Sequence, residues 1–149
     1  LDSCRTSVFT VPETTKFRQL RDLHKVVFFS SSQQEDILAL DALYRLFPEL
    51  SLDLTLVSVP SKKFVGRENS SVAHIMEYCR ANYPAYTFKT APLTLSNPID
   101  DFKKIESETP IDLIVVPNKK KNMFARLFNP TLAHKLLFHS DIPMMSIPV

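Results

Sequence analysis

The chain has 149 residues, 44% of them hydrophobic and 23% charged, and its formal net charge is only +2. This length and composition suit one globular domain, and so small a net charge argues against a protein that binds nucleic acid through its overall charge. The two cysteines, Cys4 and Cys79, suggest no disulfide framework or metal site, and no apolar run reaches the ~18 residues of a membrane span, so we expect a cytoplasmic protein without direct membrane insertion.

The N-terminal residues 7–11 read Ser-Val-Phe-Thr-Val, a composition typical of a strand, which Pro12 ends. A similar order of residue types returns at residues 144–148, Met-Met-Ser-Ile-Pro, at an offset of 136 residues. This offset is about one small-domain length. We therefore interpret residues 1–13 as the last strand of a preceding homologous domain or an edge strand of this one, and residues 14–24 as a linker. Because Leu1 is not an initiator Met, we expect a longer parent chain.

Strand-like and helical patterns alternate through the rest of the chain. Strands are predicted at residues 25–29, 52–59, 86–90, 112–116 and 144–147. Helices are predicted at residues 34–47, from Ser70 or Ser71 to about residue 82, and after the Asn-Pro pairs at 97–98 and 129–130, where Asn is a favoured N-cap and Pro suits the first helical position. An alternating series of this kind indicates a doubly wound α/β fold.

Few residues show a pattern that predicts chemistry. The run from Lys119 to Lys121 suits a solvated basic loop, because no aromatic platform accompanies it. His134 and His139 are five residues apart and do not share a helical face, so we expect no metal site. Ser140 and Asp141 lie beside His139 without a nucleophile elbow, so we expect no catalysis there. Met144 and Met145 are interpreted as packing residues.

The C-terminal unit resembles the universal stress protein (UspA-like) family from about residue 25 to residue 149. ATP-binding members carry G-x2-G-x9-G followed by Ser or Thr after the fourth strand. Laid on residues 116–137 without a gap, the family pattern is matched by Arg126, Leu127, Ala133 and Lys135, and Thr131 stands at the Ser/Thr position. The three glycine positions are occupied here by Pro117, Lys120 and Pro130, and Ser31 stands where many members have Asp after the first strand.

The resemblance implies ATP as a cofactor, but these replacements argue against strong binding. Backbone N–H groups and a helix N-terminus donate to phosphate in such a loop, and proline has no N–H to donate. The loss of two such bonds corresponds to ~3–6 kcal/mol at most. The degenerate nucleotide-site positions are therefore Ser31, Pro117, Lys120, Pro130 and Thr131, and we expect no bound cofactor, no metal and no catalytic residue.

By resemblance, residues 25–149 should form a three-layer α/β sandwich of the adenine nucleotide alpha hydrolase-like type, with a five-stranded parallel sheet of order 3-2-1-4-5. We also expect residues 7–11 to lie antiparallel beside the last strand, as an additional edge strand. The function implied is a stress-response or regulatory module, not an enzyme, that pairs with itself or with a preceding tandem domain through the last strand, from Met144 to Val149. Two alternatives stay open: an atypical ATP-binding member of the family, and a cytoplasmic regulatory domain of a membrane transporter.

Overall fold

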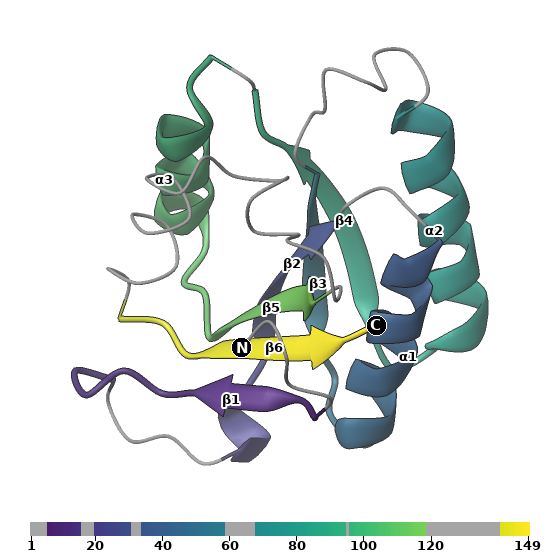
Figure 1. The fold of residues 1–149 in the computed structure, drawn as a ribbon, viewed down its shortest axis with the longest axis horizontal. Coiled ribbons are helices and arrows are strands. Elements are labelled where there is room, and N and C mark those ends of the chain that lie inside the picture. The colour runs from purple at the N-terminus through teal and green to yellow at the C-terminus, as the bar shows by residue number, and fades with distance from the viewer. Residues whose placement is uncertain (1–5, 16–19, 31–33, 59–67, 95, 119–140) are drawn as a thin grey trace.

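The computed structural model describes residues 6–15, 20–30, 34–58, 68–94, 96–118 and 141–149. Strands and helices alternate along most of the described chain (Figure 1). The strands are β1 (Val8–Thr10), β2 (Lys25–Ser30), β3 (Asp53–Ser58), β4 (Thr87–Pro92), β5 (Leu113–Asn118) and β6 (Met144–Pro148). The helices are η1 (Leu20–Asp22), a short 3-10 helix, and the α-helices α1 (Glu35–Leu46), α2 (Glu68–Asn82) and α3 (Pro98–Glu108).

The six strands form one mixed sheet in the order β1-β6-β5-β2-β3-β4. The strands from β2 to β6 pair in parallel, and β1 pairs antiparallel with β6. Numbered in chain order from residue 25, the parallel strands lie in the order 3-2-1-4-5. The sheet as a whole is nevertheless six-stranded and mixed, so a description as a five-stranded parallel sheet is incomplete, because the N-terminal segment adds an antiparallel strand at one edge.

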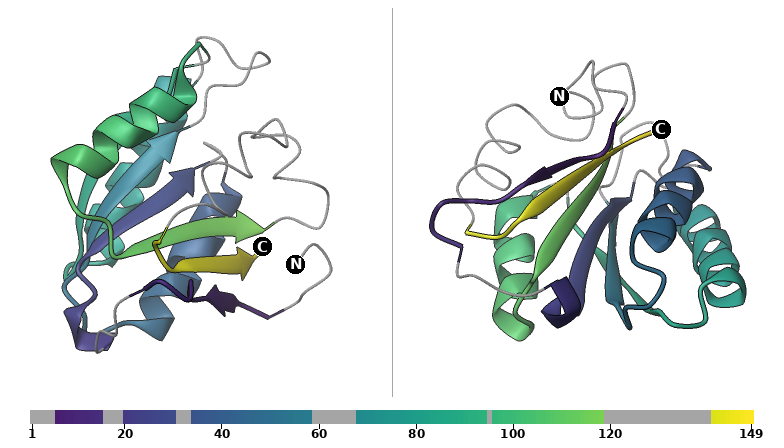
Figure 2. Two further views of the ribbon diagram at one scale, coloured as in Figure 1. Left: turned by 90° about the vertical axis from the view of Figure 1, so that its left-hand side faces the viewer. Right: turned by 90° about the horizontal axis from the view of Figure 1, so that it is seen from below.

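Helices pack on both faces of this sheet, which explains why the central strands β2 and β5 are apolar on both sides (Figure 2). Helices α1 and α2 cover one face, where Phe28, Leu54 and Val115 join a large buried cluster with Leu40 of α1. Helix α3 covers the other face, where its buried Phe102 stacks on Phe29 with ring centroids 5.7 Å apart. The structure is therefore an α/β fold with a core on each side of the sheet.

Helix α2 begins earlier than the sequence predicted. Its first residue is Glu68, so Ser70 and Ser71 lie within the helix instead of capping it. The end at Asn82 agrees with the prediction. Serine is tolerated inside a helix although it is favoured at the N-cap, so the serine pair did not locate the boundary.

Helix α3 begins at the predicted Asn-Pro pair, but the predicted side-chain cap does not form. Pro98 occupies the first turn, and the carbonyl of Asn97 accepts the N–H of Asp101 at 3.1 Å, whereas the Asn97 side chain makes no capping bond. Thr94 instead donates its N–H and its hydroxyl to Asp101 Oδ2, at 2.7 and 2.6 Å. These two bonds lower the pKa of the Asp101 carboxyl. A carboxylate in the first turn also complements the helix dipole.

Among the described residues, no helix is both long and apolar enough to span a membrane. The predicted basic loop from Lys119 to Lys121 and the predicted helix after Pro130 lie outside the described residues.

Candidate functional site

The strands β2 and β5 lie side by side at the centre of the sheet and part at their carboxyl ends. They are paired from Val26↔Leu113 to Phe28↔Val115. Beyond that point β2 continues along β3, and β5 continues along β6. Open α/β sheets bind ligands outside the carboxyl ends of their strands, at such a switch point. The carboxyl ends of β2 and β5 are therefore a candidate ligand site.

Three buried polar residues surround this switch point. Ser30 ends β2, Asn118 ends β5, and Asp36 lies in the first turn of α1, with exposed fractions of 1%, 6% and 0%. The Ser30 hydroxyl donates to Asp36 Oδ2 at 2.7 Å. The N–H groups and the dipole at a helix N-terminus favour an acidic side chain, so the buried carboxyl group of Asp36 has local support.

These groups can hydrogen-bond, but they do not form a nucleophilic centre. A serine nucleophile is usually activated by an imidazole or an amine. The hydroxyl of Ser30 is instead hydrogen-bonded to the carboxyl group of Asp36. His24, which precedes β2 and therefore lies at the opposite end of that strand, contacts the carbonyl oxygen of Ser51 through Nδ1 at 2.7 Å. Sequence reasoning missed Asp36 and Asn118, although an acidic residue shortly after a serine turn at the start of a helix is a usable signal.

Pro117 lies inside β5 and not in the loop where the sequence placed it. It pairs with Ile147 of β6. Ile114 donates its backbone N–H to the carbonyl of Pro143, and the carbonyl of Asn118 accepts the N–H of Val149. The backbone hydrogen-bonding groups of Ile114 and Asn118 therefore point towards β6. Because these groups alternate along a strand, the backbone nitrogen of Pro117 points towards β2. The pairing of β2 with β5 has already ended at that point, so the missing N–H of proline removes no hydrogen bond from the sheet. The other predicted positions, Ser31, Lys120, Pro130 and Thr131, lie outside the described residues.

A second candidate site is the edge of the sheet formed by β1 and β6. Val8, Phe9 and Thr10 lie opposite Ser146, Met145 and Met144. This pairing confirms the prediction that residues 7–11 lie antiparallel beside the last strand. The last strand is consequently not the outermost one, because β1 of the same chain covers its outer side.

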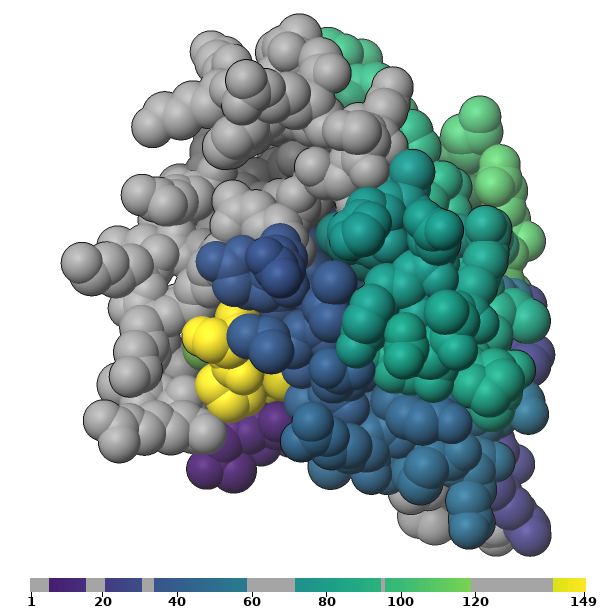
Figure 3. All heavy atoms as spheres, turned by 90° about the vertical axis from the view of Figure 1, so that its right-hand side faces the viewer, coloured from purple at the N-terminus to yellow at the C-terminus, as the bar shows by residue number. Residues whose placement is uncertain are grey.

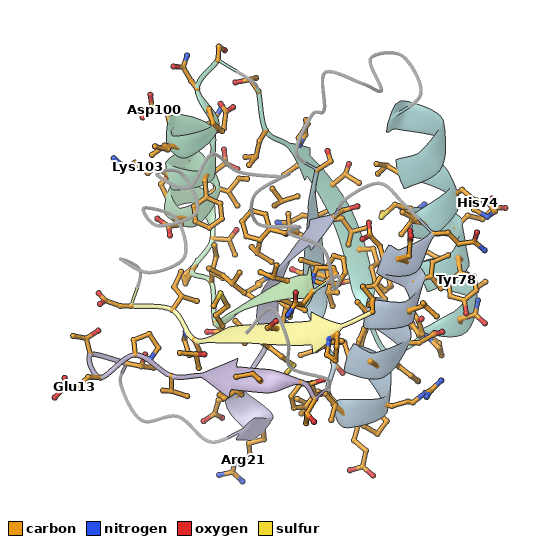
Figure 4. The ribbon with its side chains drawn as sticks, in the orientation of Figure 1. Glu13, Arg21, His74, Tyr78, Asp100 and Lys103 are labelled. Atoms are coloured by element: carbon orange, nitrogen blue, oxygen red, sulfur yellow. The ribbon has the colours of Figure 1, made fainter. Side chains whose placement is uncertain are left out.

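The turn that follows β1 is fastened to the segment before β6. The N–H of Thr15 donates to the carbonyl of Pro12 at 3.0 Å and closes the turn. The Thr14 hydroxyl donates to Asp141 Oδ1 at 2.5 Å, and the Thr15 hydroxyl donates to the Asp141 carbonyl at 2.9 Å. Glu13 projects outward from the same turn (Figure 4). Asp141 therefore has a structural contact on this side of the sheet.

All four tyrosines of the chain gather where α1 and α2 meet the β4 side of the sheet. The Tyr83 ring lies 4.9 Å from Tyr44 and 6.2 Å from Tyr86 between centroids, and its hydroxyl donates to Asp41. Burial and this bond raise the pKa of Tyr83 above its ordinary value. Figure 3 shows this face, with α1 between α2 and the C-terminal strand.

Cys79 lies beneath this cluster and is fully buried. Burial, together with the charge of Asp41, raises the pKa of its thiol to about 12. A thiol with so high a pKa is protonated at neutral pH, and the thiolate is the reactive form. Cys79 is therefore a core residue and not a nucleophile.

A small hollow of about 120 Å³ lies on the α3 face, at the amino ends of β2 and β3. Lys25 and Asp53 form an ion pair on its wall, and Thr55 and Lys89 lie beside them. Partial burial raises the pKa of Asp53, but the hydrogen bonds from Lys25 and Thr87 and the nearby ammonium charges outweigh it and lower the pKa overall.

Within the described ranges, no three His, Cys, Asp or Glu side chains gather as metal ligands. His74 points outward from α2, next to Tyr78 (Figure 4), whereas His134 and His139 lie outside those ranges. No protein-family model matches this chain, and no curated protein matches it.

Proposed function

We propose that this chain is a cytoplasmic regulatory module of the universal stress protein type, which acts through protein contacts and neither binds ATP strongly nor catalyses a reaction. The observation that carries the proposal is the pairing of β1 with β6, in which Phe9 lies opposite a residue 136 positions later, Met145. A strand that accepts an antiparallel strand along its outer side provides a protein-binding edge. The proposal includes the family's domain, with its sheet order 3-2-1-4-5, for residues 25–149, and residues 1–13 as the last strand of a preceding homologous domain.

The switch point supports the part of the proposal that concerns ATP. Pro117 has no N–H to offer a phosphate, and the hydroxyl of Ser30 is already bonded to Asp36. A hydrogen bond contributes ~0.5–1.5 kcal/mol, so a ligand that displaced this one would lose part of its own binding energy. Tight nucleotide binding is not expected from such a site.

The protein-contact part is tested with a labelled peptide of residues 6–15, titrated against the full chain and its Thr10→Pro variant by fluorescence anisotropy. Thr10 lies opposite Met144, and proline there removes an N–H from the ladder and frees the outer side of β6. We expect saturable binding to the variant and little to the unaltered chain. A peptide of the same composition in scrambled order is the control. A Thr10→Pro variant that is folded but does not bind the peptide would contradict the proposal.

The ATP part is tested by isothermal titration of the full chain with Mg-ATP. We expect no heat of binding at micromolar nucleotide. A micromolar Kd would instead establish the atypical nucleotide-binding alternative. The Asp36→Asn variant would then show whether the buried carboxyl group takes part, because it keeps the shape of the side chain and removes the acidic group.

A further inference from the structure

The pairing of β1 with β6 has two-fold symmetry. Phe9 and Met145 lie directly opposite each other, and the repeat of residues 8–12 at residues 144–148 also makes them equivalent. The neighbouring pairs are Val8 with Ser146 and Thr10 with Met144. In the repeat, residue 8 is equivalent to residue 144 and residue 10 to residue 146. Exchanging the two strands therefore reproduces the same pairing, as a two-fold axis between Phe9 and Met145 requires.

This axis is perpendicular to the sheet. Residues that lie directly opposite each other in antiparallel strands project their side chains to the same face, so Phe9 lies on the face of Met145, which α1 and α2 cover. The N–H of Val149 donates to Asn118 of β5, so the odd-numbered residues of β6 direct their backbone groups towards β5 and the even-numbered ones towards β1. The N–H of Phe9 consequently points away from β6. The axis passes between two residues that share no backbone hydrogen bond.

Helix α1 has an apolar flank on this face of the sheet. Its opposite flank packs at the end of α2, where the ring of Tyr44 lies 4.9 Å from that of Tyr83. Leu38, Ala42 and Leu46 are spaced four residues apart and form a ridge along the flank that faces away from α2. Helix α1 contacts β6, and Figure 3 shows it beside both the C-terminal strand and β1.

The exposed large apolar side chains of the described residues gather on these neighbouring elements. Two belong to α1 and two lie on or next to β1: Leu38, Leu46, Phe9 and Val11, with exposed fractions of 57%, 50%, 45% and 55%. Single exposed apolar residues are normal on a protein surface, whereas a group of them marks a contact with another apolar surface. The symmetry of the strand pairing indicates which surface this is.

We propose that the helix equivalent to α1 in the preceding homologous domain packs antiparallel on the ridge of Leu38, Ala42 and Leu46. The inference rests on the proposed function, which assigns residues 1–13 to that domain. A two-fold axis perpendicular to the sheet places the equivalent helix on the same face, beyond β1, with its direction reversed. The corresponding flank of that helix then faces the ridge across Phe9, and the sheet of its domain continues beyond β1.

The ridge has the form that an antiparallel helix requires. Side chains four residues apart on one helix pack into the grooves of another, and the small side chain of Ala42 between two leucines allows close approach. Two antiparallel helices also bring helix ends of opposite partial charge together. The partner that fits is therefore a helix with apolar side chains at the same spacing.

The test measures how fast a cysteine on the ridge reacts with iodoacetamide, in this chain and in its parent chain, which under the proposed function contains the preceding domain. Leu46→Cys is the probe. Arg45→Cys is the matched control, because Arg45 is exposed and lies on the side of α1 that faces away from the sheet. The background is Cys4→Ser, and Cys79 stays because its buried thiol is protonated at neutral pH. Mass spectrometry of the peptides gives the rate at each site.

We expect the two introduced cysteines to react at similar rates in the 149-residue chain. In the parent chain Leu46→Cys should react roughly tenfold more slowly or less, because a buried site reacts only when the contact opens, whereas the rate of Arg45→Cys should not change. As a second measurement, Leu46→Lys should lower the melting temperature of the parent chain more than that of the 149-residue chain, because only in the parent chain does the charge enter an apolar contact.

Each outcome decides between the inference and the proposed function. Equal rates for Leu46→Cys in the two chains would overturn the inference, whereas binding of the strand peptide to the Thr10→Pro variant would still support the proposed function. Protection in the 149-residue chain that grows with its concentration would overturn the inference in favour of a second copy. A parent chain without a homologous domain upstream would overturn both.

Discussion

The two edges of the sheet, β1 and β4, differ in how their outer sides are protected. Thr87 and Leu93 donate their backbone N–H groups towards β3. By alternation, the backbone N–H and C=O positions of Phe88, Thr90 and Pro92 point away from β3, towards the outer side of the sheet. Pro92 offers no N–H there, and the exposed Lys89 adds a charge to the strand. The edge at β1 has neither protection. The difference indicates that β4 ends the sheet, whereas β1 can extend it.

The two edges also differ in what holds them. Backbone pairing with β3 over six positions and side-chain packing together hold β4, since Phe88 packs with Tyr83 and Tyr86 beside the ends of α1 and α2. Backbone pairing with β6 holds β1, and the turn after it is fastened by hydroxyl bonds to Asp141. The β4 edge is therefore part of the core, and the β1 edge can be loosened without opening the core.

The largest expected effect is at Tyr83, on the β4 side. Tyr83→Ala removes a ring that is 3% exposed and packs against three other tyrosines, and truncation of a large buried aromatic side chain costs ~3–5 kcal/mol. We expect the free energy of unfolding in urea to fall by about that amount. An effect below ~1 kcal/mol would show that the tyrosines do not anchor this edge.

Two phenylalanine variants separate the ring from the hydroxyl. Tyr83→Phe keeps the ring and removes a hydrogen bond to Asp41, so we expect a loss of ~1–3 kcal/mol. Tyr78→Phe is the matched control, because its hydroxyl lies 3.4 Å from the same carboxylate, a distance at which hydrogen bonds are weak. Equal losses in the two variants would contradict this assignment.

A smaller loss in the free energy of unfolding is expected when a proline is introduced into β1. The size of this loss should depend on whether the backbone N–H that the proline removes points towards β6 or away from it. Thr10→Pro removes an N–H that faces β6 and should cost ~1–3 kcal/mol. Phe9→Pro removes an N–H that faces outward and should cost less, although the two substitutions are adjacent. Hydrogen exchange of β5 and β3 amides should be unchanged in both variants, because the core does not depend on β1.

The sequence predicted much of this fold because the strands are encoded by short apolar runs. The runs at residues 25–29 and 112–116 locate β2 and β5, and the similarity of residues 8–12 to residues 144–148 located the strands that pair at the edge. The helix boundaries were less accurate. Ser70 and Ser71 fit an N-cap and lie inside α2, because preference for a cap is weaker than the continuation of a helix.

The candidate site was predicted less well than the fold, and for a physical reason. A glycine or proline pattern reports where a loop should be, but Pro117 lies in β5 because neighbouring strands part at that point and require no N–H from it. Asp36 was taken only as part of a helix, since burial and a bond to Ser30 depend on how far β2 extends along β3. Such contacts between elements are not encoded in a local pattern.

The smallest expected effect concerns Asp53, on the β3–β4 side. Hydrogen bonds from Lys25 and Thr87 hold the pKa of its carboxyl below the ordinary value of 3.8. Because the folded-state pKa is lowered, this stabilisation is present above pH 3.8 and is lost as the pH falls through the folded-state pKa. Asp53→Asn should therefore lower the melting temperature at pH 6, by an amount that corresponds to ~1 kcal/mol or less for a partly exposed pair, and the difference from the unaltered chain should shrink at lower pH. Lys25→Gln keeps the carboxylate and removes the ammonium, so it should show part of the same loss. A difference for Asp53→Asn that stays constant from pH 6 to pH 2.5 would mean that this side of the sheet is held by packing alone.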